Sequence, residues 1–146
     1  MAKKTKSGVG FKLLKVVTEQ FAIVEDQFIE EEKVRLNNGF RFGIDQSKHI
    51  IVVFANFKFE TSGKPFLIIE AGCFFEIEET KWDEFLGLEG KILTIPKNIM
   101  AHLATLAVGT TRGILHAKTE NTPFNNYFIP TINVAKMIAE DVVFNI

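Results

Sequence analysis

Apolar and polar residues alternate strictly along residues 34–44. Asn38 alone interrupts the apolar row at the even positions, which holds Val34, Leu36, Phe40, Phe42 and Ile44. The positions between them carry polar residues or glycine. A period of two is typical of a strand that buries one of its faces. The pattern therefore predicts a half-buried strand over residues 34–44.

Three further stretches predict strands, and polar turns separate the later ones. Residues 49–60 and 65–78 carry apolar side chains at every second position, and residues 11–24 alternate less cleanly. Polar residues at 46–48 and at 62–64 supply turns. Such turns between long strands are typical of antiparallel sheets rather than of strand–helix–strand units. We expect a four-stranded antiparallel sheet, arranged as a meander with a crossover.

The opposite face of this sheet is apolar only in patches. Ile50, Val52 and Phe54 lie on it, interleaved with charged residues such as Lys58 and Glu70. An antiparallel sheet normally leaves one face polar. Apolar patches on both faces predict helices over one face and a second copy of the chain, or another apolar partner, over the other. We therefore expect a homo-oligomer, either a dimer or a tetramer.

The second half of the chain predicts helices. A long helix is expected from a cap at Thr94, with Pro96 in its first turn, to about Lys118. Its apolar stripe is expected to hold Leu103, Leu106, Thr110 and Ile114. A loop follows over residues 119–131, and Asn133 is placed to cap a last helix. Helical spacing in that last helix joins Val134, Met137, Ile138 and Val142.

These elements define the expected fold class. It is α+β, with the sheet followed by two helices packed on one of its faces. Residues 81–90 are expected to form at most a short helical turn. The whole chain, residues 1–146, is expected to form one domain, with residues 1–9 flexible.

Composition narrows the class of protein. Seventeen basic and eighteen acidic residues give a formal charge of −1, which argues against a nucleic-acid binder that works by charge alone. A single cysteine, Cys73, excludes an internal disulfide framework. The expected location is the cytoplasm, because no signal peptide or run of about 18 apolar residues is present and no membrane insertion is expected.

The residues that usually carry chemistry form no recognisable motif. His49, His102 and His116 lack the spacing of a metal site. Cys73 falls in the apolar row of a strand, which favours an inert buried thiol. We therefore expect no enzyme activity, no cofactor and no metal. The unusual feature is the loop, which holds Phe124, Tyr127, Phe128 and Ile129 between two prolines. Such residues either seal the core or receive an apolar segment of a partner.

The order of these elements resembles the SecB family of export chaperones. Residues 11–18 look like the family's opening strand, and residues 66–77 are similar to its fourth strand. Thr110-Thr111-Arg112 resembles the arginine-bearing stretch of its first long helix. Residues 122–124 and 129–133 resemble its inter-helix loop and the entry to its last helix. The resemblance spans roughly residues 11–138 and depends on the order of these motifs.

The resemblance implies a holdase that works without nucleotide and keeps preproteins unfolded for export. It implies a tetramer built as a dimer of dimers and apolar grooves for unfolded polypeptide clients. The candidate groove residues are Phe40, Phe42, Phe74, Phe75, Phe124, Tyr127, Phe128 and Ile129. The candidate oligomer-interface residues are Ala101, Ala104, Ala107, Gly109 and Arg112.

The chain also departs from the family's pattern. The acidic positions through which the family docks the SecA motor correspond to Gln20, Val24 and Ile68. Client holding is therefore implied more strongly than SecA as a partner. One alternative is a dedicated SecB-like chaperone for the antitoxin of a toxin–antitoxin pair. A second is a hot-dog-type hydrolase, a fold that usually places its helix between the early strands.

Overall fold

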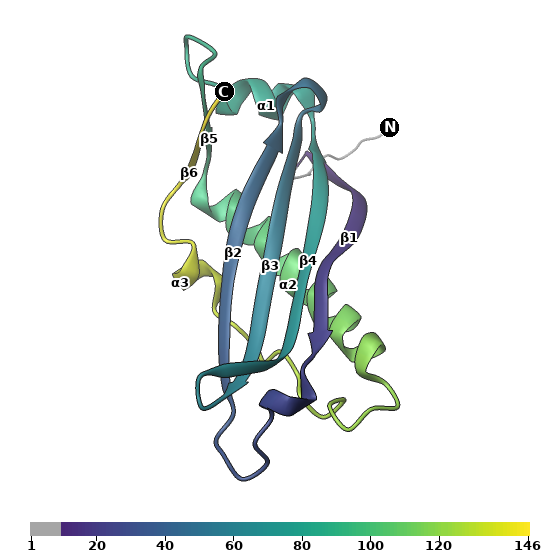
Figure 1. Ribbon diagram of the computed structural model, residues 1–146. Helices are drawn as coiled ribbons and strands as arrows, with labels where there is room; N and C mark the ends of the chain where they lie inside the picture. The colour runs from purple at the N-terminus through teal and green to yellow at the C-terminus, as the bar shows by residue number, and fades with distance from the viewer. Residues whose placement is uncertain (1–9) are drawn as a thin grey trace.

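A four-stranded antiparallel sheet organises the computed structural model, which describes residues 10–146 (Figure 1). Its strands are β1 (Phe11–Ile23), β2 (Arg35–Asp45), β3 (Ile50–Thr61) and β4 (Lys64–Ile77). Their order across the sheet is β1-β4-β3-β2. The predicted meander with a crossover is confirmed: β2, β3 and β4 are neighbours in chain order, and β1 crosses over to pair with β4. The prediction for residues 1–9 lies outside the described residues.

The remaining elements follow the sheet in the sequence. They are α1 (Glu79–Phe85), β5 (Ile92–Ile95), α2 (Lys97–Thr119), α3 (Val134–Met137) and β6 (Val142–Asn145). Two 3₁₀ turns, η1 (Glu25–Gln27) and η2 (Gln46–Lys48), lie between the strands of the sheet. The fold is therefore α+β, and α2 crosses one face of the sheet against β3 and β4 (Figure 1).

The start of the long helix differs from the sequence prediction. Thr94 does not cap it, because Thr94 lies in β5, and α2 begins at Lys97 after Pro96. The Lys97 backbone N–H donates instead to Asp141 Oδ1, at 2.9 Å. This acceptor is 44 residues away in the sequence, so local capping rules could not identify it. The glycines do not interrupt α2, which runs unbroken for 23 residues.

The predicted last helix was wrong in its extent. Asn133 does cap α3, since its side-chain oxygen accepts a hydrogen bond from the Lys136 backbone N–H at 3.2 Å. The helix has only four residues, however, and Val142 belongs to strand β6, where it pairs with Ile95. Pairing with a strand distant in the sequence overrides the helical spacing of the apolar residues. Neither β5 nor β6 was predicted.

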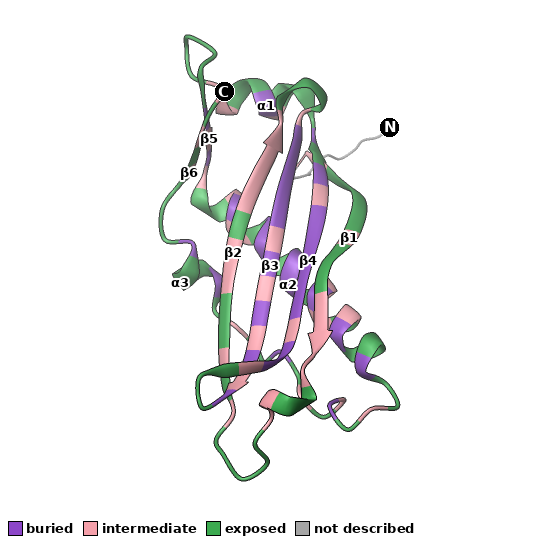
Figure 2. Cartoon of the chain, in the orientation of Figure 1, coloured by how far each residue is buried: buried purple, intermediate pink, exposed green. Residues whose placement is uncertain are grey.

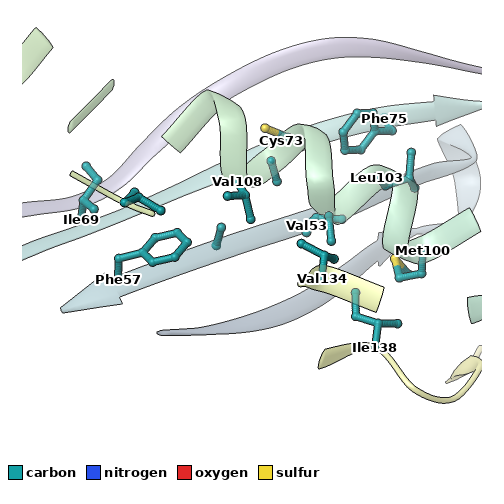
Figure 3. Packing of buried hydrophobic residues seen from close by; sticks show 14 of the residues in the cluster. Val53, Phe57, Ile69, Cys73, Phe75, Met100, Leu103, Val108, Val134 and Ile138 are labelled. Carbon is teal, nitrogen blue, oxygen red and sulfur yellow. The ribbon is translucent and has the colours of Figure 1, made fainter. Parts of the chain in front are cut away.

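The core lies between the sheet and α2. On β3 and β4 the alternate positions that face α2 are almost fully buried (Figure 2). Figure 3 shows Leu103 and Val108 of α2 packed toward Val53 and Cys73 of the sheet. The helix buries a stripe different from the predicted one: Met100, Leu103, Ala104, Ala107, Val108, Thr111, Leu115 and Thr119. Leu106, a predicted stripe residue, is exposed.

In the part of the chain that the structure describes, no helix or second sheet lies over the opposite face. We call this the open face. Its side chains cover one another: the Arg41 guanidinium lies 3.8 Å from the centre of the Phe54 ring and pairs with Glu70 at 3.3 Å. The ring rests on Gly72, where an added Cβ would lie 2.8 Å from a ring carbon. Gly72 is thus required by the close approach of Phe54.

Candidate functional site

The loop between α2 and α3 is fixed to the helix by Arg112. Its guanidinium donates to the carbonyl oxygens of Ile129 and Pro130, each at 2.7 Å. Asn125 adds hydrogen bonds from its Nδ2 to the His116 carbonyl and to the Thr119 hydroxyl, both at 3.0 Å. The hydrogen bonds from the Arg112 guanidinium are charge-assisted, and such bonds are stronger than neutral ones. The loop is therefore held in one position relative to α2 by Arg112, which is half-buried in this contact; its place in an oligomer interface stays a prediction.

The loop residues divide between core and surface. Phe124 and Ile129 keep only 5% and 2% of their surface exposed, so they cannot line a client groove as predicted. Tyr127 is half-buried, and Phe128 is 57% exposed with its ring stacked on His116. The predicted group is thus separated: two residues seal the core, and Phe128 presents an apolar surface to solvent.

Phe124 and Tyr127 belong to an aromatic cluster at one end of the sheet. Ring centres lie 4.8 Å apart between Phe28 and Phe66 and 5.3 Å apart between Phe66 and Tyr127. Phe28 also meets Phe124 edge to face at 5.5 Å. Aromatic pairs in this range stabilise a fold beyond their buried area. The cluster joins the segment after η1, the start of β4 and the loop, three segments far apart in the sequence.

Strand β2 carries the second group of predicted groove residues. Phe40 and Phe42 lie on the side of the sheet that faces α2, stacked with ring centres 6.4 Å apart, and both are half-buried. Phe42 lines a cavity of about 280 Å³ with Met137, the last residue of α3, and with residues that follow it, among them Ile138 and Val142. Within residues 10–146, β2 pairs only with β3, so its outer backbone edge has no neighbouring strand.

Sequence reasoning missed Met137 and Val142 as partners of Phe42. Val142 was assigned to a helix, and nothing in the local pattern indicates that the chain after α3 returns to β2. The only signal in the sequence for this contact is that both are large apolar residues near the C-terminal end. Met137 is exposed in the structure.

The neighbouring residues Phe74 and Phe75 point to opposite faces of the sheet. Phe75 has no exposed surface and packs edge to face against Phe11 in the core, so it cannot contact a client as predicted. Phe74 is half-buried on the open face, with the Lys15 ammonium 4.6 Å from its ring centre. The structure therefore does not bring Phe74 together with Phe40 and Phe42.

The outer face of α2 carries small residues four positions apart. They are Ala101, Thr105, Gly109, Gly113 and Ala117, which we call the small-residue stripe. A Cβ added to Gly109 or Gly113 would meet no atom within 4 Å. Of the predicted interface residues, Ala101 and Gly109 lie on this stripe. Ala104 and Ala107 do not, because the sheet of the same chain buries both completely.

All three histidines lie against aromatic rings, His116 against Phe128. His49 stacks on Trp82 with ring centres 4.7 Å apart, and His102 meets Phe11 at 5.5 Å. Burial raises the pKa of the Cys73 thiol, which keeps it protonated and unreactive. Among residues 10–146, no three His, Cys, Asp or Glu side chains are grouped in a way that suits a metal ion.

Comparison with known proteins assigns no family. No protein-family model matches the chain, and no curated protein matches its sequence. Among the helices of the described residues, none combines the length and the apolar character needed to cross a membrane.

Proposed function

We propose that this protein is a cytoplasmic, SecB-like holdase that binds unfolded polypeptides without nucleotide. The observation that carries the proposal is the unpaired edge of β2, where Phe40 and Phe42 lie beside an apolar cavity. We call this edge, with Met137 and Val142, the client surface, and we propose the exposed Phe128, which stacks on His116 near the C-terminal end of α2, as a separate client contact.

The backbone edge accounts for binding that does not depend on sequence. An extended segment laid beside β2 would form main-chain hydrogen bonds with its free N–H and C=O groups, as in other cases of strand addition. Every polypeptide has these groups, so the edge discriminates against none. An unfolded chain can adopt the extended form that a folded one cannot.

The apolar side chains account for a preference for unfolded clients. Alternate side chains of an extended segment point to the same side. Those facing α2 would meet Phe40, Phe42 and the cavity of about 280 Å³ that Met137 and Val142 help to line. Unfolded chains expose apolar residues that folded chains bury. An apolar surface therefore binds the unfolded state in preference to the folded one.

The order of elements supports the same proposal. A crossed four-stranded sheet, a long helix, a proline-bearing loop and a short final helix follow each other as in the SecB family that the sequence resembles. In the hot-dog alternative the helix lies between early strands, whereas α2 follows all four strands of the sheet. We therefore do not propose a hydrolase.

We also propose that α2 packs on a second copy of the chain through the small-residue stripe. A glycine inside a helix costs about 1 kcal/mol relative to alanine. Because no contact within residues 10–146 uses the space above Gly109 and Gly113, we propose that close approach of another backbone is the benefit that offsets this cost. We therefore propose that the protein is a homodimer or a homotetramer.

A second candidate is a dedicated chaperone for one client, such as an antitoxin. The observation that favours it is on the open face, where Gln20 pairs with Glu70 and Ala22 with Ile68. Gln20 and Ile68 occupy positions where the SecB family carries acids that dock SecA. A general export role through SecA therefore has less support than client holding itself.

Capture of a fluorescently labelled, permanently unfolded polypeptide tests the proposal. Phe128→Ser and Phe42→Ser should each weaken binding about tenfold or more, as expected for a lost aromatic anchor. Leu88→Ser is the matched control, because Leu88 is fully exposed on the turn after α1, away from β2. Equal binding by all four proteins, each shown to be folded by circular dichroism, would refute the client surface.

A further inference from the structure

A partly open cavity of about 300 Å³ lies on the open face, on the side of the sheet opposite the core and α2. Four apolar residues and three charged ones line it: Leu14, Ile50, Val52, Phe74, Lys15, Lys48 and Asp45. Ile50 and Val52 form part of this lining, with only 9% and 7% of their surface exposed although no helix or second sheet among the described residues lies over this face. The cavity is thus an apolar pocket built by side chains alone.

A β-bulge supplies one wall of this pocket. The pairing of β1 with β4 shifts register between Leu13 and Lys15, so Leu14 has no partner on β4. The shift lets two consecutive residues, Leu14 and Lys15, both line the cavity. A regular strand would send neighbouring side chains to opposite faces. Bulges commonly re-aim a side chain beside a functional site.

The 3₁₀ turn η2 supplies the opposite wall. Asp45 accepts hydrogen bonds from the Ser47 hydroxyl at 2.8 Å and from the Lys48 backbone N–H at 3.3 Å. These contacts engage Oδ1 of Asp45 and fix the turn whose Lys48 side chain lines the cavity. Asp45 stays ionised and also attracts Lys48, which adds to the Ser47 hydroxyl in lowering the pKa of Asp45. The pocket lining therefore carries two cationic groups, Lys15 and Lys48, against one carboxylate, an excess of one positive charge.

We propose that this pocket binds a small amphipathic carboxylate. The apolar lining of Ile50, Val52 and Phe74 takes the tail, and Lys15 and Lys48 pair with the carboxylate at the mouth. A volume of about 300 Å³ corresponds to about ten water-sized groups, which suits a tail of about eight carbons. Pockets of this size are at the small end of ligand sites. The pocket is separate from the proposed client surface. It lies on the open face, whereas Phe40 and Phe42 lie on the face toward α2.

Titration of the full chain with sodium octanoate, followed by calorimetry and by backbone amide NMR, tests the assignment. Saturable one-to-one binding is expected with a Kd of about 1 mM or tighter. Amide shifts should centre on residues 14, 15, 50, 52 and 74. Absence of saturable binding, or shifts centred on Phe42 and Phe128 instead, would overturn the proposal.

Variants separate the charge from the apolar lining. Lys15→Gln combined with Lys48→Gln should weaken octanoate binding at least tenfold, and Val52→Phe should abolish it by filling the cavity. Lys58→Gln is the matched control, since Lys58 lies on the same face outside the pocket, and it should bind as the natural chain does. If Lys58→Gln weakens octanoate binding as much as the double variant does, the carboxylate is attracted by positive charge on the face in general. That result would contradict the site.

Two further ligands test whether the charge of octanoate is needed and whether a peptide binds the same pocket. 1-Octanol should bind at least tenfold more weakly than octanoate, because it lacks the charge, and equal affinity would contradict the role of the lysines. A short peptide with one leucine beside two glutamates should bind no better than octanoate. Tighter binding of that peptide at the same residues would replace the small-molecule assignment with a protein partner.

Discussion

The two faces of the sheet are built from the same strands but are covered in different ways. Toward α2, residues such as Val53 and Phe57 are buried by a helix and have almost no exposed surface. On the open face, Phe54 is covered by the Arg41 guanidinium, and Arg41 in turn pairs with Glu70. One face is closed by secondary structure, and the other is closed by its own side chains.

The difference explains why apolar residues on both faces do not by themselves require two covering layers. Long cationic side chains can lie on apolar neighbours while their charges stay in water. Lys15 over Phe74 and Arg41 over Phe54 do this on the open face. Exposed apolar side chains lie elsewhere: Leu13 and Val16 on the edge strand β1, Phe128 in the loop and Met137 beside β2.

The largest expected effect comes from the neighbours Phe74 and Phe75. Phe75→Ala should lower the free energy of unfolding by about 3–5 kcal/mol, because it removes a fully buried ring and leaves a cavity. Phe74→Ala, on the open face, should cost clearly less. Urea unfolding of both variants measures the two values. Equal losses would show that the open face is packed as tightly as the core.

The next effect concerns the two sides of α2. Ala104→Leu should lower stability by about 1–3 kcal/mol, since it overpacks the contact with the sheet. Ala117→Leu lies on the small-residue stripe and should leave the fold intact while weakening self-association. Urea unfolding and light scattering separate the two results. Unchanged assembly of the Ala117 variant would argue against the stripe as an interface.

Arg112 tests the attachment of the loop. Arg112→Gln should lose two charge-assisted hydrogen bonds to Ile129 and Pro130 and cost about 1–3 kcal/mol. Amide hydrogen exchange over residues 120–133 should become faster than in the natural chain. Arg35→Gln, at the exposed start of β2, is the control and should leave that exchange unchanged. Slow exchange in both variants would mean that the buried Phe124 and Ile129 hold the loop without Arg112.

The smallest effect is a pH dependence at Asp45. The Ser47 hydroxyl that donates to this carboxylate holds the pKa of Asp45 below its ordinary value of 3.8. The ionised form stabilises the folded state, so this contribution is complete above the ordinary pKa and is lost as the pH falls through the lowered one. Asp45→Asn should therefore melt slightly lower than the natural chain at pH 7, and the difference should shrink as the pH falls below the ordinary pKa of 3.8. A constant difference across that range would contradict the assignment.

The sequence predicted the sheet well because period-two alternation is a local signal. All four strands of the sheet were located within about two residues, the usual uncertainty of strand ends. The faces of α2 were predicted less well, because Leu106 and Leu103 are equally apolar and only the position of the sheet decides which is buried. The cap from Asp141 and the pairing of β5 with β6 depend on contacts across more than 40 residues.

The candidate groove was predicted only in part. Loop position and apolar character identified Phe124, Tyr127, Phe128 and Ile129 as a group, but these properties do not distinguish a residue that seals the core from one that stays exposed. Phe128 stays exposed, and Phe124 joins an aromatic cluster with Phe28, which no sequence spacing connects to it.

Amide hydrogen exchange of β2, with and without a permanently unfolded polypeptide, tests the proposed client surface. We expect protection of amides in β2 and in residues 137–142 when the polypeptide is added, because its main chain would pair with the free edge of β2. Amides of β1 and β4 should not change. Protection confined to β1 and β4, or no protection of β2 at saturating polypeptide, would contradict the proposed client surface.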